Sequence, residues 1–396
     1  MLEFFSASTR MANPQRAIME CLEVALGTDN QDCDLVIINA SIGHNQRELV
    51  AQTHAQCPGA RVVAASCAGV VGREGVSESM KDVALMAIRG RDFSVAHVDG
   101  IHGGNSAEKS VEMADSLRRS NPGINMVYLI APGIDIANDR VIAGFESVFG
   151  PEVTLFGATS SDNMRGLATF QAVDDRVFQH AAFAVGFSDP TLEVDTQATH
   201  GFVAAGDPLI VTRAEGHRIL ELNGRPAWPE YLARLGLPSG ATLADTIPIG
   251  AVAEELPPQL AREYGNDHIL RVITRHDPDG ALHYATTCSV GTRLWLTIRD
   301  EERIFKDLDR LIAAMESQAR GRKPVAVFQA DCLARGRRLF NRIMKEELVQ
   351  RMQHPFSTDG VPPPWLGMYG FGEYARLAGS NTFHNYTTAL AAIYRK

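Results

Sequence analysis

Small and hydroxylated residues gather at three points where an apolar run of the chain ends. The segments are "VVAASCAG" (62–69), "FGATSSDN" (156–163) and "GMYGFG" (367–372). Small residues let a ligand approach backbone N–H groups closely, and hydroxyl and amide side chains orient it without adding charge. We therefore predict that these segments bind a small molecule. The candidate residues are Ser66, Cys67, Gly69, Thr159, Ser160, Ser161, Asp162, Asn163, Gly370 and Gly372.

The same residue types also occur where a turn needs a particular backbone conformation, so a purely structural role stays open for each of them. Arg335, in the segment "DCLARG", presents the same choice. Its guanidinium could bind a ligand carboxylate through two parallel hydrogen bonds, or it could neutralise a carboxylate of the protein itself.

Two cysteines, Cys67 and Cys332, follow apolar runs and are candidates for the nucleophile of a hydrolase. The spacing of the chain marks no histidine as a paired base. The six cysteines form no CxxC pair, so the sequence indicates neither a zinc site nor a thioredoxin-like motif. A role as a small buried core residue stays open for Cys332.

The overall charge and hydropathy limit the classes of partner. The chain of 396 residues has a formal net charge of −9, whereas binding to nucleic acid or to an anionic membrane needs a basic surface. No apolar stretch reaches the ~20 residues of a membrane span, and the chain begins without a secretory signal. We therefore expect a cytoplasmic protein with reduced thiols that binds neither nucleic acid nor membrane.

A repeated pattern organises most of the chain. Three continuously apolar runs, "LVII" (35–38), "VYLI" (127–130) and "VAVF" (325–328), each precede a helical segment and a second apolar run. Continuous apolar runs indicate strands that are buried on both faces of a sheet. The sequence thus predicts an α/β fold with layered mixed sheets, built from repeated β-α-β units. A hairpin-like pair follows the first two units, at 83–98 and 181–196.

The segment from about 206 to 299 differs from these units. It contains short strand-like runs separated by turn signals such as "DPDG", and it indicates antiparallel strands. We therefore expect two interlocked domains, at residues 1–205 and 206–396.

An ordered series of segments resembles the FIST sensory family over nearly the whole chain. The segments are "STRMANPQRAI", "VVAASCAGVV", "GDPLIVTRAEGHRILELNGRPAWPEYLARLG", "VGTRLWLTIRD", "DCLARG" and "FHNYT". The resemblance implies an N-terminal and a C-terminal FIST domain, no catalysis, and a bacterial small-ligand sensor. It also implies a separate output partner, either a sensor histidine kinase or a cyclic-dinucleotide enzyme. Ala64, Ala65, Cys67 and Val70 depart from the usual family residues, which points away from the commoner ligand class of the family.

A subgroup of stand-alone FIST proteins senses nitric oxide through haem, and this chain resembles it in length and layout. The resemblance therefore implies haem b as a cofactor, with Arg335 as a partner for a propionate. An axial ligand would be a neutral imidazole in an apolar pocket, or less readily the Cys332 thiolate. The candidate axial histidines are His180, His200 and His384, and His384 is also a candidate ligand-binding residue.

We expect a sensor whose ligand enters a pocket between the two domains and shifts their arrangement. Two alternatives stay open, namely a metal-free sensor of an amino acid or metabolite, and an enzyme with a cysteine nucleophile. The sequence is also compatible with a homo-oligomer.

Overall fold

Three sheets of the protein repeat one plan. The structure is a computed structural model that describes residues 1–396 except 29–31, 247–248, 250 and 337–341. In each repeat, a strand and a helix precede two parallel strands that are joined by a second helix. A hairpin and a final antiparallel strand follow. This plan confirms the predicted α/β class and the repeated β-α-β units.

The three repeats have matching elements in matching order. The first contains β1 (Glu3–Thr9), α1 (Pro14–Leu26), β2 (Leu35–Ser41), α2 (Gln46–Gln56), β3 (Arg61–Cys67), β4 (Val70–Gly72), β5 (Gly75–Ser77) and β6 (Val83–Arg89). The second contains β7 (Phe93–Asp99), α3 (Ser106–Ser120), β8 (Met126–Ala131), α4 (Asn138–Phe149), β9 (Thr154–Thr159), β10 (Gln171–Val173), β11 (Arg176–Phe178) and β12 (Ala181–Phe187). The third contains β13 (Leu192–Thr199), α8 (Glu301–Ala319), β22 (Ala326–Cys332), α9 (Arg342–Gln353), β23 (Trp365–Gly370), β24 (Gly372–Leu377), β25 (Ser380–His384) and β26 (Thr388–Arg395).

The repeats exchange their hairpins in a closed cycle. The first sheet has the order β1-β6-β2-β3-β10-β11, so its last two strands come from the second repeat. In the same way, β24–β25 of the third repeat extend the sheet of the second at β9. The β4–β5 hairpin of the first repeat extends the sheet of the third at β23. Each sheet therefore depends on another repeat for its edge.

The structure corrects the two predicted hairpins at 83–98 and 181–196. Strand β6 pairs with β1 and β2, whereas β7 pairs with β12 in another sheet. Likewise, β12 pairs with β7 and β8, and β13 pairs with β26. The chain does turn where the sequence indicates, at Gly90 with φ 107°. However, the two strands beside each turn form their ladders with different sheets, which a local turn signal cannot predict.

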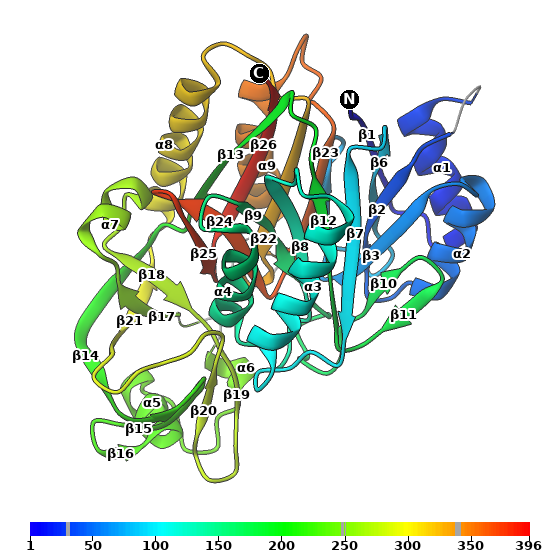
Figure 1. Ribbon diagram of the computed structural model, residues 1–396. Coiled ribbons are helices and arrows are strands. Elements are labelled where there is room, and N and C mark those ends of the chain that lie inside the picture. The colour runs from blue at the N-terminus through cyan, green and yellow to red at the C-terminus, as the bar shows by residue number, and fades with distance from the viewer. Residues whose placement is uncertain (29–31, 247–248, 250, 337–341) are drawn as a thin grey trace.

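The inner faces of the three sheets share one core. Tyr128 of β8, Phe156 of β9 and Phe328 of β22 pack with ring centroids 5.1 to 5.9 Å apart. Helices α1 and α2, α3 and α4, and α8 and α9 cover the outer faces of the first, second and third sheets (Figure 1). Burial on both faces explains why these strands are continuously apolar.

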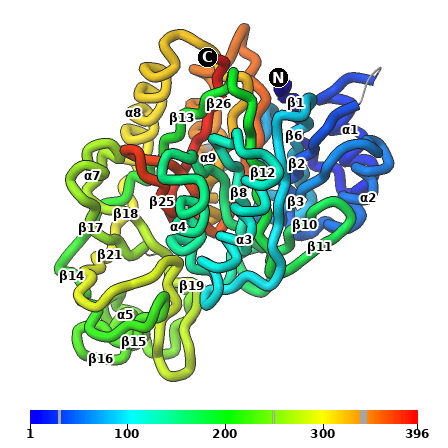
Figure 2. Tube along the Cα trace, viewed as in Figure 1, coloured from blue at the N-terminus to red at the C-terminus, as the bar shows by residue number. Residues whose placement is uncertain are grey.

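A fourth, antiparallel sheet is inserted between β13 and α8, as the turn signals of that segment predict. Its elements are β14 (Phe202–Glu215), β15 (Arg218–Leu222), β16 (Arg225–Pro226), α5 (Ala227–Leu235), α6 (Leu243–Thr246), β17 (Val252–Glu255), α7 (Pro258–Tyr264), β18 (His268–Arg271), β19 (Ile273–His276), β20 (Leu282–Tyr284) and β21 (Arg293–Arg299). Figure 2 shows this insertion at the end of the molecule away from the two termini. The two termini lie together, and Arg395 donates a hydrogen bond to the Leu2 carbonyl. No helix in the described ranges is long and apolar enough to cross a membrane.

We predict that Gly157→Ala destabilises the fold. Gly157 lies within β9 at φ 133°, and a Cβ atom there would lie 2.2 Å from the Leu129 carbonyl oxygen. The clash involves backbone, so the central ladder must shift, and we expect the free energy of unfolding to fall by about 1–3 kcal/mol in urea denaturation. The matched control is Gly59→Ala, where a Cβ atom meets nothing within 4 Å. Equal stability of the two variants would contradict the described path of β9.

Candidate functional site

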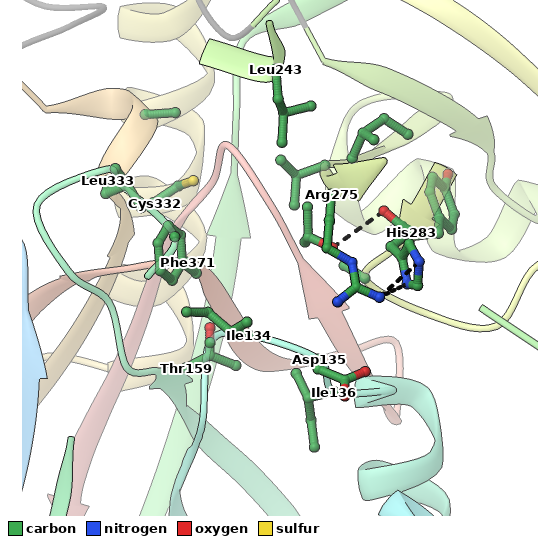
Figure 3. Close-up of a pocket in the computed structure, with 18 of the residues that line it drawn as sticks. Ile134, Asp135, Ile136, Thr159, Leu243, Arg275, His283, Cys332, Leu333 and Phe371 are labelled. Carbon is green, nitrogen blue, oxygen red and sulfur yellow. Dashed lines mark hydrogen bonds between the residues drawn. The ribbon is translucent and has the colours of Figure 1, made fainter. Parts of the chain in front are cut away.

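A cavity of about 360 Å³ lies between the second repeat, the third repeat and the inserted sheet. The loop after β8 and the end of β9 form its floor, and the start of the 3-10 turn Leu333–Arg335 forms one wall with Phe371. Residues of β19, β20 and α6 form the opposite wall, as Figure 3 shows for Leu243, Arg275 and His283. Ligands of parallel α/β sheets gather at the carboxyl ends of strands, which is where this cavity lies.

The cavity is polar on the side of the inserted sheet. Arg275 Nη2 lies 2.9 Å from His283 Nε2, and that nitrogen lies 2.8 Å from the Asp277 carboxylate. His217 Nε2 lies 3.7 Å from Asp135 Oδ1, beyond hydrogen-bonding distance. Burial, followed by the nearby His283, lowers the pKa of His217, so its imidazole is neutral at pH 7. A neutral imidazole can donate a hydrogen bond to a ligand through one nitrogen and accept one from it through the other.

Asp135 has an uncommon backbone conformation for its residue type. Its φ is 53°, in the left-handed region, and its side chain is 45% exposed. Residues in that region carry a conformational cost, and they concentrate at ligand-binding sites. Here the left-handed turn follows β8 and precedes α4, and Figure 3 shows Asp135 on the same side of the cavity as Arg275. The turn therefore places a carboxylate on the same side of the cavity as the Arg275 guanidinium.

The rest of the cavity is mainly apolar. Ile134 and Ile136 from the β8 loop, Leu333 and Phe371 from the third repeat, and Val272 from the inserted sheet contribute hydrocarbon surface. Thr159, the last residue of β9, lies among them. Its hydroxyl is buried, and no hydrogen-bond partner for it is present among the described residues. The cavity thus combines one charged side with a largely apolar interior.

Of the predicted strand-end residues, only Thr159 lines this cavity. The three strand ends do meet, as expected, but they bond mainly to one another. Ser161 donates through its amide to the Ser66 carbonyl at 3.0 Å and through Oγ to the Tyr369 carbonyl at 2.6 Å. The Gly69 carbonyl accepts from the Tyr369 amide at 2.9 Å. These contacts give the segments 66–69 and 369–370 a structural role.

The remaining strand-end candidates lie around this junction. Ser160 is fully buried and its amide donates to the Ala131 carbonyl, whereas a Cβ atom on Gly370 would lie 2.5 Å from the Thr159 carbonyl oxygen. A Cβ atom on Gly372 would lie 2.1 Å from the Phe383 ring. The close contacts at the two glycines explain their residue type without a ligand.

Asp162 organises the loop that borders the cavity. Its carboxylate accepts hydrogen bonds from the backbone amides of four successive residues, 165–168, at 2.7 to 3.4 Å. Met164, Arg165 and Gly166 of this loop line the cavity. Asp162 therefore supports the site without facing it, and the neighbouring Asn163 is half-buried outside the lining.

Arg335 lies behind the cavity wall. It is 3% exposed, its Nε donates to Asp331 Oδ1 at 3.2 Å, and its Nη1 donates to the His200 carbonyl at 3.0 Å. Its neighbours Cys332, Leu333 and Ala334 line the cavity, whereas Arg335 does not. Of the two predicted roles of Arg335, the structure therefore shows the structural one, in which its guanidinium neutralises the Asp331 carboxylate of the protein itself.

The three candidate axial histidines lie outside the cavity lining. Both ring nitrogens of His200 are engaged, because Nδ1 accepts from the Phe202 amide at 2.8 Å and Nε2 donates to the His268 carbonyl at 3.0 Å. Both nitrogens of His384 are likewise engaged, by the Tyr264 and Thr382 hydroxyls. His180 is exposed on a turn. The positions of these residues do not fit an axial ligand of a haem in this cavity.

The two candidate nucleophiles are buried. Burial raises the pKa of the Cys67 thiol, which is fully enclosed at the end of β3. Burial also raises the pKa of Cys332 well above its usual range, although Cys332 lines the cavity. A thiol that stays protonated at neutral pH is a weak nucleophile.

Sequence reasoning missed the charged and imidazole side chains of the site, namely Asp135, Arg165, His217, Arg275 and His283. Three of them come from the inserted sheet, where a charged residue near a turn is typical of a solvent-exposed surface. The available signal was the position of Asp135 directly after an apolar strand, in "YLIAPGID".

Buried neutral histidines predict that the protein is less stable in mild acid. Burial lowers the pKa of His200 to about 3 and lowers that of His384 well below its usual value. Below pH ~6.5 the unfolded chain binds these protons and the folded chain does not, so stability is complete above this pH and is lost as the pH falls. We expect a total loss of about 1.4 kcal/mol for each histidine between pH 7.5 and 5.5, measured by urea denaturation. His200→Gln should reduce this slope, and a pH-independent wild type would contradict the assignment.

Comparisons with known proteins agree on the family. The model of the FIST N domain matches residues 34–225, and that of the FIST C domain matches residues 227–376. An uncharacterized protein of Mycobacterium tuberculosis (strain CDC 1551 / Oshkosh) is 25% identical over 374 residues, which cover 90% of each chain. An uncharacterized protein of Mycobacterium bovis is 27% identical over 248 residues, which cover 59% of this chain and 58% of the relative.

Solved structures resemble the chain only distantly. A cyanuric acid hydrolase is 10% identical with a TM-score of 0.36 over the full length of both chains. Phosphoribosylformylglycinamidine synthase II from Thermotoga maritima is 9% identical with a TM-score of 0.20, covering all of this chain and 72% of the other. These scores are too low to carry an argument about fold or activity. The family models cover most of the chain, so the protein belongs to the FIST family, whose domains are sensor domains of signal transduction.

Proposed function

We propose that this protein senses a small zwitterionic molecule of the α-amino acid class in the cavity described above. One observation carries the proposal. The cavity presents a carboxylate, Asp135, and a guanidinium, Arg275, and no ion pair joins these two groups among the described residues. Opposite charges that face one space without neutralising each other are suited to a ligand that carries both charges.

Asp135 and Arg275 can each form hydrogen bonds with a ligand. The Asp135 carboxylate can accept hydrogen bonds from an ammonium group. The Arg275 side chain is 57% exposed; its Nε lies 3.6 Å from Asp277 Oδ1, and its Nη2 lies 2.9 Å from His283 Nε2. A guanidinium has five N–H donors, so further donors remain for a ligand carboxylate. The apolar residues of the floor and walls would then enclose the side chain of the ligand.

The two charges belong to different parts of the fold, which suggests how binding is transmitted. Asp135 lies in the second repeat and Arg275 in the inserted sheet. A ligand that pairs with both has a higher affinity for the arrangement in which they are close, and so shifts the population toward it. The segment 332–335 contacts the cavity on one side and the His200 carbonyl, at the start of the insertion, on the other. A separate histidine kinase or cyclic-dinucleotide enzyme would read this change.

The chemistry of haem finds less support. His180, His200 and His384 do not face the cavity, and Arg335 is occupied by Asp331. We therefore derive no step through haem or nitric oxide. An enzyme with a cysteine nucleophile is also less well supported, because burial keeps Cys332 protonated.

We predict that Asp135→Asn and Arg275→Gln each weaken binding of an amino acid. Each change removes one charge-assisted contact, which is worth about 1.5–3 kcal/mol or roughly 10- to 100-fold in Kd. A panel of the twenty amino acids is first screened by thermal shift, and the best ligands are titrated by calorimetry. The matched controls are Asp309→Asn and Arg213→Gln, both exposed and outside the cavity. Unchanged affinity in the cavity variants, or no amino acid that binds, would reject the proposal.

An absorption spectrum provides a separate test of the cofactor. After reconstitution with haem we expect no saturable Soret band that moves with nitric oxide, because protein groups engage His200 and His384 and because His180 is exposed outside the cavity. A stoichiometric band that disappears in His180→Ala but persists in the matched exposed variant His354→Ala would instead restore the haem hypothesis.

A further inference from the structure

The floor of the cavity contains a polar group that the apolar interior does not explain. Thr159 lines the cavity and is 1% exposed, and its buried hydroxyl has no hydrogen-bond partner among the described residues. Its backbone is fully used, since its carbonyl accepts from the Phe371 amide and β9 pairs with both β8 and β24. A buried hydroxyl that makes no hydrogen bond is unfavourable, so such groups usually find a partner in water or a ligand.

The repeated β-α-β architecture does not require a hydroxyl at the position of Thr159. The last residues of the three equivalent strands β3, β9 and β23 are Cys67, Thr159 and Gly370. Cys67 is enclosed by protein, and Gly370 has no side chain, so of these three equivalent positions only Thr159 places a hydroxyl-bearing side chain in the cavity lining. Valine has the shape of threonine and would fill the same place in β9 without an unpaired hydroxyl.

The hydroxyl lies apart from the charged side of the cavity. Figure 3 shows Thr159 beside Ile134 and Phe371, whereas Arg275 and His283 lie on the other side. A ligand whose ammonium and carboxylate meet Asp135 and Arg275 would therefore extend its side chain toward Thr159. Ile134, Ile136 and Val272 contribute apolar surface to the same cavity.

We propose that Thr159 selects ligands whose side chain ends in a hydroxyl or amide group. The sensor would then bind the ammonium and carboxylate at one end of the ligand and a polar group at the other end. This inference rests on the proposed function and adds the chemical class of the side chain. A site that hydrogen-bonds a polar ligand group discriminates strongly against the analogue that lacks it, because the buried partner is then left without a bond. If a water molecule is bound to the Thr159 hydroxyl in the free protein, the hydroxyl or amide group of the ligand must replace the hydrogen bond that this water makes.

The test compares matched pairs of ligands in wild type and in Thr159→Val. The probes are L-tyrosine with L-phenylalanine, L-asparagine with L-leucine, and L-glutamine with L-methionine, titrated by calorimetry. We expect wild type to prefer the polar member of at least one pair by ~10-fold or more, and Thr159→Val to lose that preference. The matched control is Thr53→Val in α2 of the first repeat, outside the cavity lining, whose buried hydroxyl donates to the Leu49 carbonyl at 2.9 Å. This control should retain the preference.

A second measurement does not depend on any ligand. Thr159→Val should have a melting temperature equal to or above that of wild type, because it removes an unpaired buried hydroxyl and keeps the shape of the side chain. A clear fall in melting temperature would reveal a structural partner and overturn the inference. Binding with no preference for the polar member, or a preference that survives in Thr159→Val, would overturn the inference alone. Failure of all six probes while another amino acid binds would overturn this inference alone, whereas failure of all twenty amino acids would overturn the proposed function as well.

Discussion

The exchange of hairpins among the three repeats is the constraint on which the rest of the structure depends. Each of the three related sheets is extended by two strands from another repeat, so the sheets form their full ladders only together. The exchange also brings the carboxyl ends of β3, β9 and β23 to one junction, where Ser66, Ser161 and Tyr369 bond to each other. Most of the loop surface that such strand ends offer to ligands in α/β folds is thereby used for assembly.

The insertion between β13 and α8 is what turns this junction into a site. It covers the strand ends of the second and third repeats and contributes Arg275, His217 and His283 to the cavity. The second repeat supplies Asp135 in a left-handed turn, and the third supplies the apolar wall around Leu333 and Phe371. Because its walls come from parts of the chain far apart in sequence, the cavity is suited to couple ligand binding to their relative positions.

Much of this architecture could be predicted from local patterns, and the limits of that prediction have physical causes. Continuous apolar runs identify strands such as Leu35–Ser41 because burial on both faces leaves no polar alternation. Turn signals near Gly90 show where the chain bends, but pairing with distant sheets decides where each strand goes. Arg335 illustrates the same limit within the site, since its partners are Asp331 and a carbonyl 135 residues away. Thr159 was identifiable because it directly follows an apolar run, whereas Arg275 lies near a turn whose burial depends on the whole fold.

In the proposed function, the cavity binds one small molecule through its two opposite charges. Calorimetric titration with L-tyrosine, N-acetyl-L-tyrosine and L-tyrosinamide tests it most directly, since each analogue removes one charge and keeps the side chain. If Asp135 binds the ammonium and Arg275 the carboxylate, both analogues should bind at least ~10-fold more weakly than the zwitterion. Equal affinity of the zwitterion and either analogue would contradict the assignment of the corresponding charged residue.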